Sequence, residues 1–458
     1  MKIREIRTYI VDGQWWNWVF AKVTTDTGLH GWGEAPLAWK EHTAATAIKE
    51  LGAVLIGEDP RHIEANLQLL HRGEYGGTGP VYNTAISALE QACWDVKGKD
   101  AGLPVHALLG GPCRDRVRVY ANGWFEGAST PDEFATAAQT VVAQGYTALK
   151  WDPFTSWITA SEREIQEATA SVAAVREAVG DEIDLCIEVH GRLNVTSAIA
   201  AAEALRPYRP FFYEEPLRPD NPAAYAKLAQ AHIGMPIAAG ERFFTRWGFR
   251  EYIEQQILDI IQPDVSHTGG ILEAKKIAAW AETYDIPVAP HNPYGPVAMA
   301  ATLQAVGSIP NVLILESFLF GCPWRQDIVK DSLEVLQPDG TLRIPDAPGL
   351  GIELDEEELR KHPYRNIPTP WSRPTVDTWG GSIFNFTAKG EQMSETPKTF
   401  STLEVAEREG VSRQRVGQLI NAKRIPGVKR MGRDWRIPNP YTILPGKTEA
   451  IGGRPKGA

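Results

Sequence analysis

The 458-residue sequence predicts an α/β fold: a modified TIM (β/α) barrel with an N-terminal α+β capping domain and a small C-terminal helix-turn-helix module. The barrel is predicted by short apolar segments that recur every 23 to 27 residues, about the length of one strand, one helix and their loops. The capping domain is predicted by strand and helix patterns before residue 115, and the third module by a basic composition after residue 397.

The first 115 residues have the pattern of a capping domain that mixes strands and helices. Residues 3–11 alternate between apolar and polar side chains, as a half-buried strand does. Residues 18–24 and 30–34 are two further strand patterns, separated by a turn sequence typical of a hairpin. Residues 84–99 place apolar side chains on one helical face. We therefore expect residues 1–115 to fold as an α+β domain.

A short loop with three tryptophans joins the first two predicted strands. It contains Trp15, Trp16 and Trp18, and a loop is a poor place to bury three large side chains. Plain packing is one interpretation, and a loop that closes over a ligand is the other, which we favour. A glycine-rich segment that follows Tyr75 is a candidate second lid. Trp15, Trp18 and Tyr75 are therefore candidate substrate contacts.

Ionisable side chains end seven strand patterns of the predicted barrel, which spans residues 116–360. Parallel strands of such a barrel end at one mouth, so their last side chains should converge there. A single charged residue after a strand is usually a solvated loop residue. Seven in phase with the strand repeat indicate a shared site instead. These side chains are Lys150, Glu188, Glu214, Glu241, Asp264, His291 and Glu316.

Three neighbouring strand ends carry carboxylates that suit a hard divalent cation. Glu188, Glu214 and Glu241 follow one another at intervals of 26 and 27 residues. Carboxylate oxygens are ligands that Mg²⁺ takes in proteins, and Mg²⁺ keeps open positions for a substrate. The trio contains no histidine or cysteine, which disfavours zinc. His190 lies two residues after Glu188, so both side chains should point to the same face of a strand.

Three other segments carry a resemblance to a known family. Residues 94–99 and 104–111 resemble the signature that ends the cap in the mandelate racemase branch of the enolase superfamily. Residues 343–351 resemble the closing segment of that family, and the resemblance extends from Lys2 to about Arg360. It implies an enzyme with a capped barrel that uses Mg²⁺ and a histidine or lysine base to remove the proton next to a carboxylate.

The resemblance also implies roles for the residues at the strand ends. Glu188, Glu214 and Glu241 match the metal ligands of the family. Asp264 and His291 match a dyad in which the carboxylate orients the imidazole and raises its basicity.

Lys150 and Glu316 match groups that act on the substrate carboxylate. Glu316 matches the residue that hydrogen-bonds this carboxylate as negative charge develops on it, and Lys150 can neutralise that charge. Racemases of this branch carry Lys-x-Lys here, and their second lysine is a base on the opposite face. This chain reads Lys150-Trp151-Asp152, so Asp152 replaces the second base and a two-base racemisation loses one arm.

Residues 188–192, with the sequence Glu-Val-His-Gly-Arg, resemble the Asp-x-His-Gly-Arg sequence of acid-sugar dehydratases of the D-galactonate type. In those enzymes the histidine protonates a departing hydroxyl, which makes His190 the candidate acid. Glu188 replaces the family's aspartate, which lengthens the ligand arm by one methylene and keeps its metal role. Asp152 and Arg192 join the candidate substrate contacts.

These residues together predict a Mg²⁺-dependent dehydratase of a sugar acid, an aldonate or an aldarate. His291 would remove the C2 proton, and His190 would protonate the 3-hydroxyl as it leaves, to give a 2-keto-3-deoxy acid. An epimerase or cycloisomerase on the same scaffold is the first alternative. A metabolite-sensing regulator that binds DNA is the second, and the complete set of acid, base and metal residues disfavours it.

The C-terminal part of the sequence has a different composition. Residues 361–397 are rich in Pro, Ser and Thr and read as a linker. Residues 398–440 predict two helices around Gly410 and a basic hairpin, and they resemble excisionase-like and MerR-like DNA-binding domains. DNA is therefore a candidate partner of residues 398–440, and a basic appendage without that role is the alternative. We expect residues 441–458 to be disordered.

Charge and composition bound the remaining possibilities. The net charge is −10, but residues 398–458 carry +8 and the rest −18, which favours a separate module with its own partner. The four cysteines are dispersed and lack the spacing of metal ligands, so we expect reduced thiols. No apolar segment reaches membrane-spanning length, and the N-terminus begins a strand pattern. We expect a cytoplasmic homo-oligomer that does not bind membranes.

Overall fold

The structure of the chain is a computed structural model that divides into two compact units, Met1–Pro374 and Thr375–Ala458. In the first unit the described residues are 1–73, 79–155, 159–318, 321–330 and 333–367. In the second unit they are 399–400, 405–406, 411–423, 425–426, 428–431 and 434–438. Tyr75, which the sequence analysis selected, lies outside the described residues.

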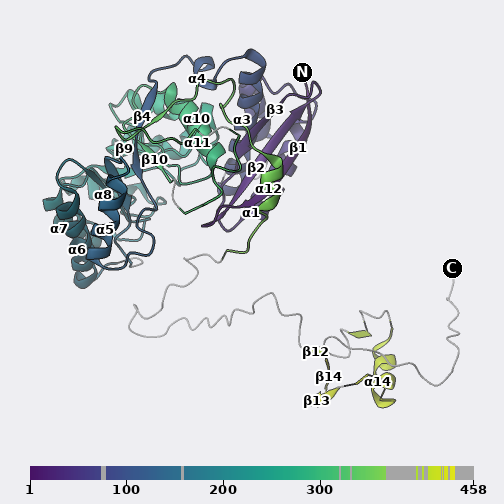
Figure 1. Cartoon of the computed structure of the whole chain (residues 1–458). Helices are drawn as coiled ribbons and strands as arrows, with labels where there is room; N and C mark the ends of the chain where they lie inside the picture. The colour runs from purple at the N-terminus through teal and green to yellow at the C-terminus, as the bar shows by residue number, and fades with distance from the viewer. Residues whose placement is uncertain are drawn as a thin grey trace. The chain divides into compact units, whose positions relative to one another are not determined.

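The cap is an antiparallel three-stranded sheet covered by helices. Strand β2 lies between β1 and β3, and α3 packs against β3 (Figure 1). Gly33 of β3 permits this close approach, because a Cβ atom there would collide with the carbonyl oxygen of Ala88. The elements are β1 (Ile3–Asp12), β2 (Asn17–Thr25), β3 (His30–Glu34), α1 (Glu41–Gly52), the 3₁₀ helix η1 (Ala53–Leu55), α2 (Ile63–Arg72), α3 (Pro80–Ala101) and α4 (Val105–Leu108).

The barrel begins with β4, and its parallel strands alternate with helices as far as β10. The strand order is β10-β4-β5-β6-β7-β8-β9, and parallel bridges of Val288 to Ile261 and Val312 close the ring. The strands are β4 (Arg116–Ala121), β5 (Ala148–Trp151), β6 (Asp184–Glu188), β7 (Phe212–Glu214), β8 (Ile237–Ala239), β9 (Ile260–Ile261) and β10 (Leu315–Ser317). The predicted capped barrel is therefore confirmed.

Seven helices follow the strands of the described barrel. Two of them start with reciprocal side-chain caps: Thr130 with Glu133 for α5, and Ser161 with Glu164 for α6. In Figure 1 the helices α5 to α8 lie on the side of the unit away from the cap sheet. The helices are α5 (Pro131–Val142), α6 (Glu162–Val179), α7 (Val195–Leu205) with η2 (Arg206–Tyr208), α8 (Pro222–Gln230), α9 (Thr245–Glu254), α10 (Ile271–Glu282) and α11 (Pro296–Gly307).

After β10 the chain returns to the cap. Strand β11 (Thr341–Arg343) pairs antiparallel with β4, and α12 (Glu356–Lys361) follows it. Residues 362–365, which lie in the predicted linker, contact the cap: the backbone N–H of Asp12 donates to the carbonyl of His362 at 3.0 Å. In the described part of the chain, the unit that begins with the cap therefore also ends on it.

Two buried carboxylates of the cap join it to barrel helices. Glu34 of β3 accepts hydrogen bonds from the backbone N–H groups of Gly295 and Ala298, both at 2.8 Å, at the start of α11. Glu90 of α3 accepts two from the first two residues of α10, at 2.8 and 2.9 Å. Burial raises the pKa of each carboxyl to about 7, against the effect of these N–H donors. Each carboxylate thus satisfies helix donors that would otherwise be buried without acceptors.

The described residues of the C-terminal unit include one helix and three short strands with defined bounds. They are β12 (Thr399–Phe400), α14 (Arg413–Asn421), β13 (Lys429–Met431) and β14 (Asp434–Pro438), with β14 between the other two strands. Ser412 caps α14 by accepting a hydrogen bond from the backbone N–H of Arg415. The described residues thus contain the second predicted helix and the predicted hairpin. Of the first predicted helix, Val405 and Ala406 are described, as helical and buried.

Two expectations from composition can also be compared with the structure. All four cysteines are free, as the sequence predicts. Among the described residues, no helix is both long enough and apolar enough to span a membrane.

Candidate active site

The ends of β6, β7 and β8 bring the three predicted metal ligands together. Glu188 and Glu214 are paired residues of neighbouring parallel strands, and Glu241 follows β8 by two residues. One carboxylate oxygen from each lies within 4.8 Å of the others. The barrel register, rather than any local sequence, creates this cluster, because the three glutamates are far apart along the chain.

The surroundings of this cluster fit a divalent cation. Burial and the charge of Glu188 raise the pKa of Glu214 well above its ordinary value. The Oε2 atom of Glu214 is buried, and no described residue donates a hydrogen bond to it. Three converging carboxylates with an oxygen that lacks a partner form a donor set suited to a hard cation such as Mg²⁺.

Lys150, at the end of β5, lies between the glutamate trio and Glu316. Its Nζ atom is 2.8 Å from Glu214 Oε1, 3.1 Å from Glu316 Oε1 and 3.3 Å from Glu188 Oε2. Burial alone would lower the pKa of Lys150, but the charges of Glu214 and Glu316 raise it well above its ordinary value. Lys150 therefore supplies a permanent positive charge at the mouth of the barrel.

Asp264 and His291 form a buried hydrogen-bonded pair. Asp264 Oδ2 is 2.6 Å from His291 Nδ1, and Asp264 Oδ1 accepts a hydrogen bond from the backbone N–H of Ser266 at 2.7 Å. The other ring nitrogen, Nε2, lies 3.3 Å from Glu241 Oε2. Burial opposes the charged ring, but the charges of Glu241 and Glu316 and the hydrogen bond to Asp264 raise the pKa of His291 to about 10.

A second pair of the same kind lies on the other side of the trio. Asp152 Oδ2 is 2.5 Å from His190 Nδ1, and Arg192 donates a hydrogen bond to the same oxygen. The backbone N–H of His190 donates to Glu188 Oε1 at 2.7 Å. Burial opposes the charged ring, but Glu188 and Asp152 raise the pKa of His190 to about 9.

The pairing changes the interpretation of Asp152 and Arg192, which the sequence analysis selected as substrate contacts. The structure shows them bound to each other, with Asp152 also holding His190. A carboxylate on Nδ1 fixes the tautomer and the orientation of an imidazole. Asp152 therefore orients His190 in the same way that Asp264 orients His291.

Glu316, the middle residue of β10, is held by two residues that sequence reasoning did not identify. Its Oε1 accepts a hydrogen bond from Asn122 Nδ2 at 2.7 Å, and its Oε2 accepts one from the backbone N–H of Asn292 at 2.8 Å. Burial opposes ionisation, but the charges of Lys150 and His291 lower the pKa of Glu316. Asn122 directly follows β4, so its position after a predicted strand was the signal that could have identified it.

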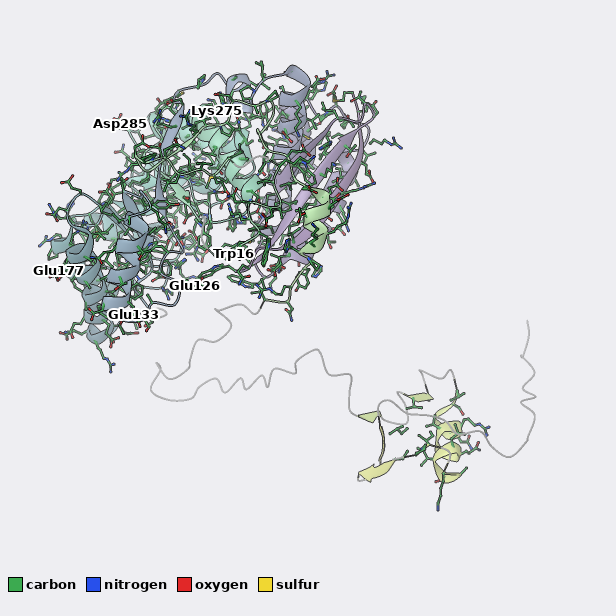
Figure 2. The ribbon with its side chains drawn as sticks, viewed as in Figure 1. Trp16, Glu126, Glu133, Glu177, Lys275 and Asp285 are labelled. Carbon is green, nitrogen blue, oxygen red and sulfur yellow. The ribbon has the colours of Figure 1, made fainter. Side chains whose placement is uncertain are left out.

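Aromatic rings cover the His291 side of the site. The Trp16 ring lies 6.1 Å from the ring of Tyr294 and 5.4 Å from that of Phe318, and Tyr294 packs edge-on against His291 at 5.6 Å. Figure 2 shows Trp16 between the cap and the barrel. Trp15 also packs against Phe318, at 5.6 Å.

Trp18, a candidate substrate contact, has a different environment. It is only 2% exposed, and its ring packs under the guanidinium of Arg325 at 5.5 Å. Of the three tryptophans in this segment, Trp16 is therefore the one that contacts Tyr294 beside the histidine, and the sequence analysis did not select it.

Comparisons with known proteins agree with this architecture. Residues 8–110 match the mandelate racemase / muconate lactonizing enzyme N-terminal domain, and residues 133–358 match the enolase C-terminal domain-like family. The chain is 39% identical to a D-galactonate dehydratase of Ralstonia nicotianae over 84% of its own length and 99% of that protein. It is 36% identical to a D-gluconate dehydratase of Thermoproteus tenax over 80% of its length and 75% of that protein.

A solved structure gives the same result for the fold. A crystal structure of an enolase superfamily member from Salmonella Typhimurium matches with a TM-score of 0.75 and 33% identity, over 79% of this chain and 98% of that one. Both family matches fall on the cap and the barrel, and the C-terminal unit lies beyond them. The chain belongs to the enolase superfamily, with the N-terminal domain of mandelate racemase and muconate lactonizing enzyme.

Proposed function

We propose that the chain is a Mg²⁺-dependent dehydratase that converts a sugar acid, an aldonate or an aldarate, into a 2-keto-3-deoxy acid. The observation that carries this proposal is the pair of histidines that flank the glutamate trio, each with Nδ1 on an aspartate at 2.5 or 2.6 Å. The names of the relatives, D-galactonate and D-gluconate dehydratase, support the reaction class and the kind of substrate.

Removal of the C2 proton is the first half of the reaction. That proton is weakly acidic because its loss creates a second negative charge beside the substrate carboxylate. Glu188, Glu214 and Glu241 would hold Mg²⁺, which supplies Lewis-acid stabilisation of the enediolate when it is bound. Lys150 neutralises the substrate carboxylate. Glu316 lies 3.1 Å from Lys150 Nζ and is ionised in the free site, because the charges of Lys150 and His291 lower its pKa, so it can donate a hydrogen bond to the developing charge only after it takes up a proton.

His291 is the base in this scheme. Asp264 holds its Nδ1, so Nε2 faces the C2 proton. The negative charges of Glu241 and Glu316 raise the pKa of His291 and favour a proton on its ring. A cation bound by Glu241 would offset part of this charge and lower the pKa, which would leave Nε2 free to accept the proton of the substrate.

Loss of the 3-hydroxyl is the second half of the reaction. Electrons of the enediolate form the C2–C3 double bond as the C3–O bond breaks, and His190 gives its proton to the departing oxygen, which leaves as water. The enol product then becomes the 2-keto-3-deoxy acid by taking up a proton at C3 and losing the proton of its 2-hydroxyl. The raised pKa of His190 keeps this acid protonated near neutral pH.

An epimerase or cycloisomerase on the same scaffold is the enzyme alternative. Epimerisation at C2 needs a second base on the opposite face, and Asp152, at the position of that base, is bound to His190 and Arg192. His190 itself could return a proton to C2, so the products decide between the two reactions.

The test is a screen of mono- and diacid sugars with added Mg²⁺, read by formation of a semicarbazide-reactive 2-keto acid. We expect one group of substrates to give keto acid and exchange of the C2 proton in D₂O. His232→Asn is a matched control, because His232 is exposed and has φ +49°, a conformation that asparagine tolerates. The proposal would be contradicted if the screen gave epimerised sugar acid and no member of the library gave a keto acid.

We also propose a second, separate function for the C-terminal unit, which is DNA binding. Helix α14 buries Val416, Leu419 and Ile420 and exposes Gln414, Arg415 and Gln418. Glutamine and arginine side chains near the start of a helix are donors suited to base edges and phosphates. The antiparallel hairpin β13–β14 follows the helix, as in small DNA-binding modules with a wing.

Binding to a labelled mixed-sequence DNA duplex tests this function. We expect Arg415→Ala to weaken binding and the affinity of the unaltered chain to fall steeply with salt. Deletion of residues 398–458 should abolish binding and leave turnover intact. Arg360→Met, on the first unit, is the charge-matched control. If the deletion left DNA binding unchanged, the proposal that this unit binds DNA would be wrong.

A further inference from the structure

A short segment that follows α12, residues 362–365, lies along the start of the loop that carries Trp15 and Trp16. We call these residues the return strap, and residues 12–17 the tryptophan loop. The backbone N–H of Asp12 donates to the carbonyl of His362 at 3.0 Å, and Val11 and Pro363 form an antiparallel bridge. The return strap therefore extends the outer edge of β1 at the point where the tryptophan loop begins.

Arg365 connects the strap to both ends and the middle of the tryptophan loop. Its backbone N–H donates to Asn17 Oδ1 at 2.8 Å, and Asn17 Nδ2 donates to its carbonyl at 2.9 Å. Its guanidinium donates from Nε to Asp12 Oδ2 at 2.8 Å and from a terminal nitrogen to the carbonyl of Gln14. One planar fork thus binds a side chain and a backbone group that lie two residues apart.

The tip of the loop reaches the aromatic residues beside the proposed base. Trp16 contacts the rings of Tyr294 and Phe318, and Tyr294 packs against His291. The loop backbone is irregular, with Gln14 at φ +73°, so its shape depends on side-chain contacts. Gln14 receives two of them: its N–H donates to Asp12 Oδ1 at 2.8 Å, and its carbonyl accepts from Arg365.

We propose that Arg365 is a positioning residue that holds the tryptophan loop closed over the His291 side of the active site. Arg365 contacts none of the residues proposed to react, and it acts through the loop. Its side chain is 47% exposed, so its replacement leaves the hydrophobic core intact. The catalytic part of this proposal rests on the proposed dehydratase, but the structural part does not.

The test compares Arg365→Met with Arg360→Met in the full-length chain. The control residue Arg360 lies in α12, just before the return strap. Its side chain is 64% exposed and pairs with Glu356. Methionine keeps the apolar stem and removes the fork, so we expect faster hydrogen exchange in the peptide containing residues 12–17 of Arg365→Met alone. We expect KM for the sugar acid to rise about tenfold with a smaller change in kcat, because the loop must then be ordered on binding.

The two readouts separate the possible failures. If the unaltered chain turns over no sugar acid, the proposed function fails, and hydrogen exchange still decides the role of Arg365. If Arg365→Met leaves both the exchange of residues 12–17 and KM unchanged, the positioning role is wrong. Asp12→Asn removes the charged partner of the fork, so Arg365→Met should have less effect on KM in that background; full additivity would contradict the proposed contact.

Discussion

The two histidine–aspartate pairs of the active site share a local geometry and differ in their surroundings. Both histidines bind an aspartate through Nδ1, at 2.6 Å for His291 and 2.5 Å for His190. The His291 side chain is only 10% exposed and packs against Tyr294 near Trp16, whereas the His190 side chain is 38% exposed. The aspartate therefore fixes the orientation of each ring, and the enclosure around the ring is the difference between the histidine that we propose as the base, His291, and the one that we propose as the acid, His190.

The largest effect is expected on the enclosed side. His291→Asn should reduce both C2 proton exchange in D₂O and keto acid formation by about 10⁴-fold or more, because both steps begin with the same proton removal. Proton NMR of recovered substrate and the keto acid assay measure the two steps. Exchange at the rate of the unaltered enzyme would assign the base to another residue.

The open side should separate the same two steps. His190→Asn should reduce keto acid formation by about 10³-fold and leave C2 proton exchange within a few-fold, because the acid acts only as the hydroxyl leaves. Both assays run on one preparation, with His232→Asn as the control. Unchanged keto acid formation would show that His190 is not the acid.

The aspartates allow a matched pair of substitutions. Asp264→Asn should reduce both exchange and dehydration by about 100-fold, and Asp152→Asn should reduce dehydration alone by a similar factor, because each amide disturbs the tautomer of its own histidine. Melting temperatures of the two variants control for folding. If Asp152→Asn reduced both steps equally, the two pairs would not work independently.

The pH dependence of the two steps provides the smallest and most specific effect. The pKa of His190 is raised to about 9, so keto acid formation should fall about tenfold per pH unit above that value as the acid loses its proton. Mg²⁺ bound at Glu188 would move this limb to lower pH. Exchange of the C2 proton should not fall over the same range, because the base acts in its deprotonated form. Parallel pH profiles for the two steps would contradict this division.

The sequence predicted the ionisable side chains at the strand ends of the barrel, but it missed Asn122, which directly follows β4. Glu188 and Glu214 end β6 and β7, and Asp264 follows β9 by three residues. The apolar patterns of these strands repeat at a nearly constant interval, and parallel strands end at one mouth. The convergence of these groups follows from topology alone. The cap was predicted separately, from the strand, hairpin and helix patterns before residue 115.

Contacts between distant loops were not predictable. The hydrogen bond that Asp152 Oδ2 accepts from His190 Nδ1 joins the loops after two strands, so the sequence could suggest a missing base but not the new partner of Asp152. Which of Trp16 and Trp18 faces the active site depends on the direction of each side chain at the start of β2. Arg365 fell in a segment rich in Pro, Ser and Thr, and its partners lie about 350 residues earlier in the chain.

The buried carboxylates of Glu34 and Glu90 make the cap and the barrel depend on each other, because they accept hydrogen bonds from the starts of two barrel helices. Each replaces a local cap for the helix it contacts, so α10 and α11 lack side-chain caps of their own. A chimera that joined this cap to a foreign barrel would leave several amide groups without acceptors in a dry interface, unless the recipient's helices began in the same place. We therefore expect single substitutions in the loops to change substrate specificity at a lower cost in stability than exchange of the whole cap.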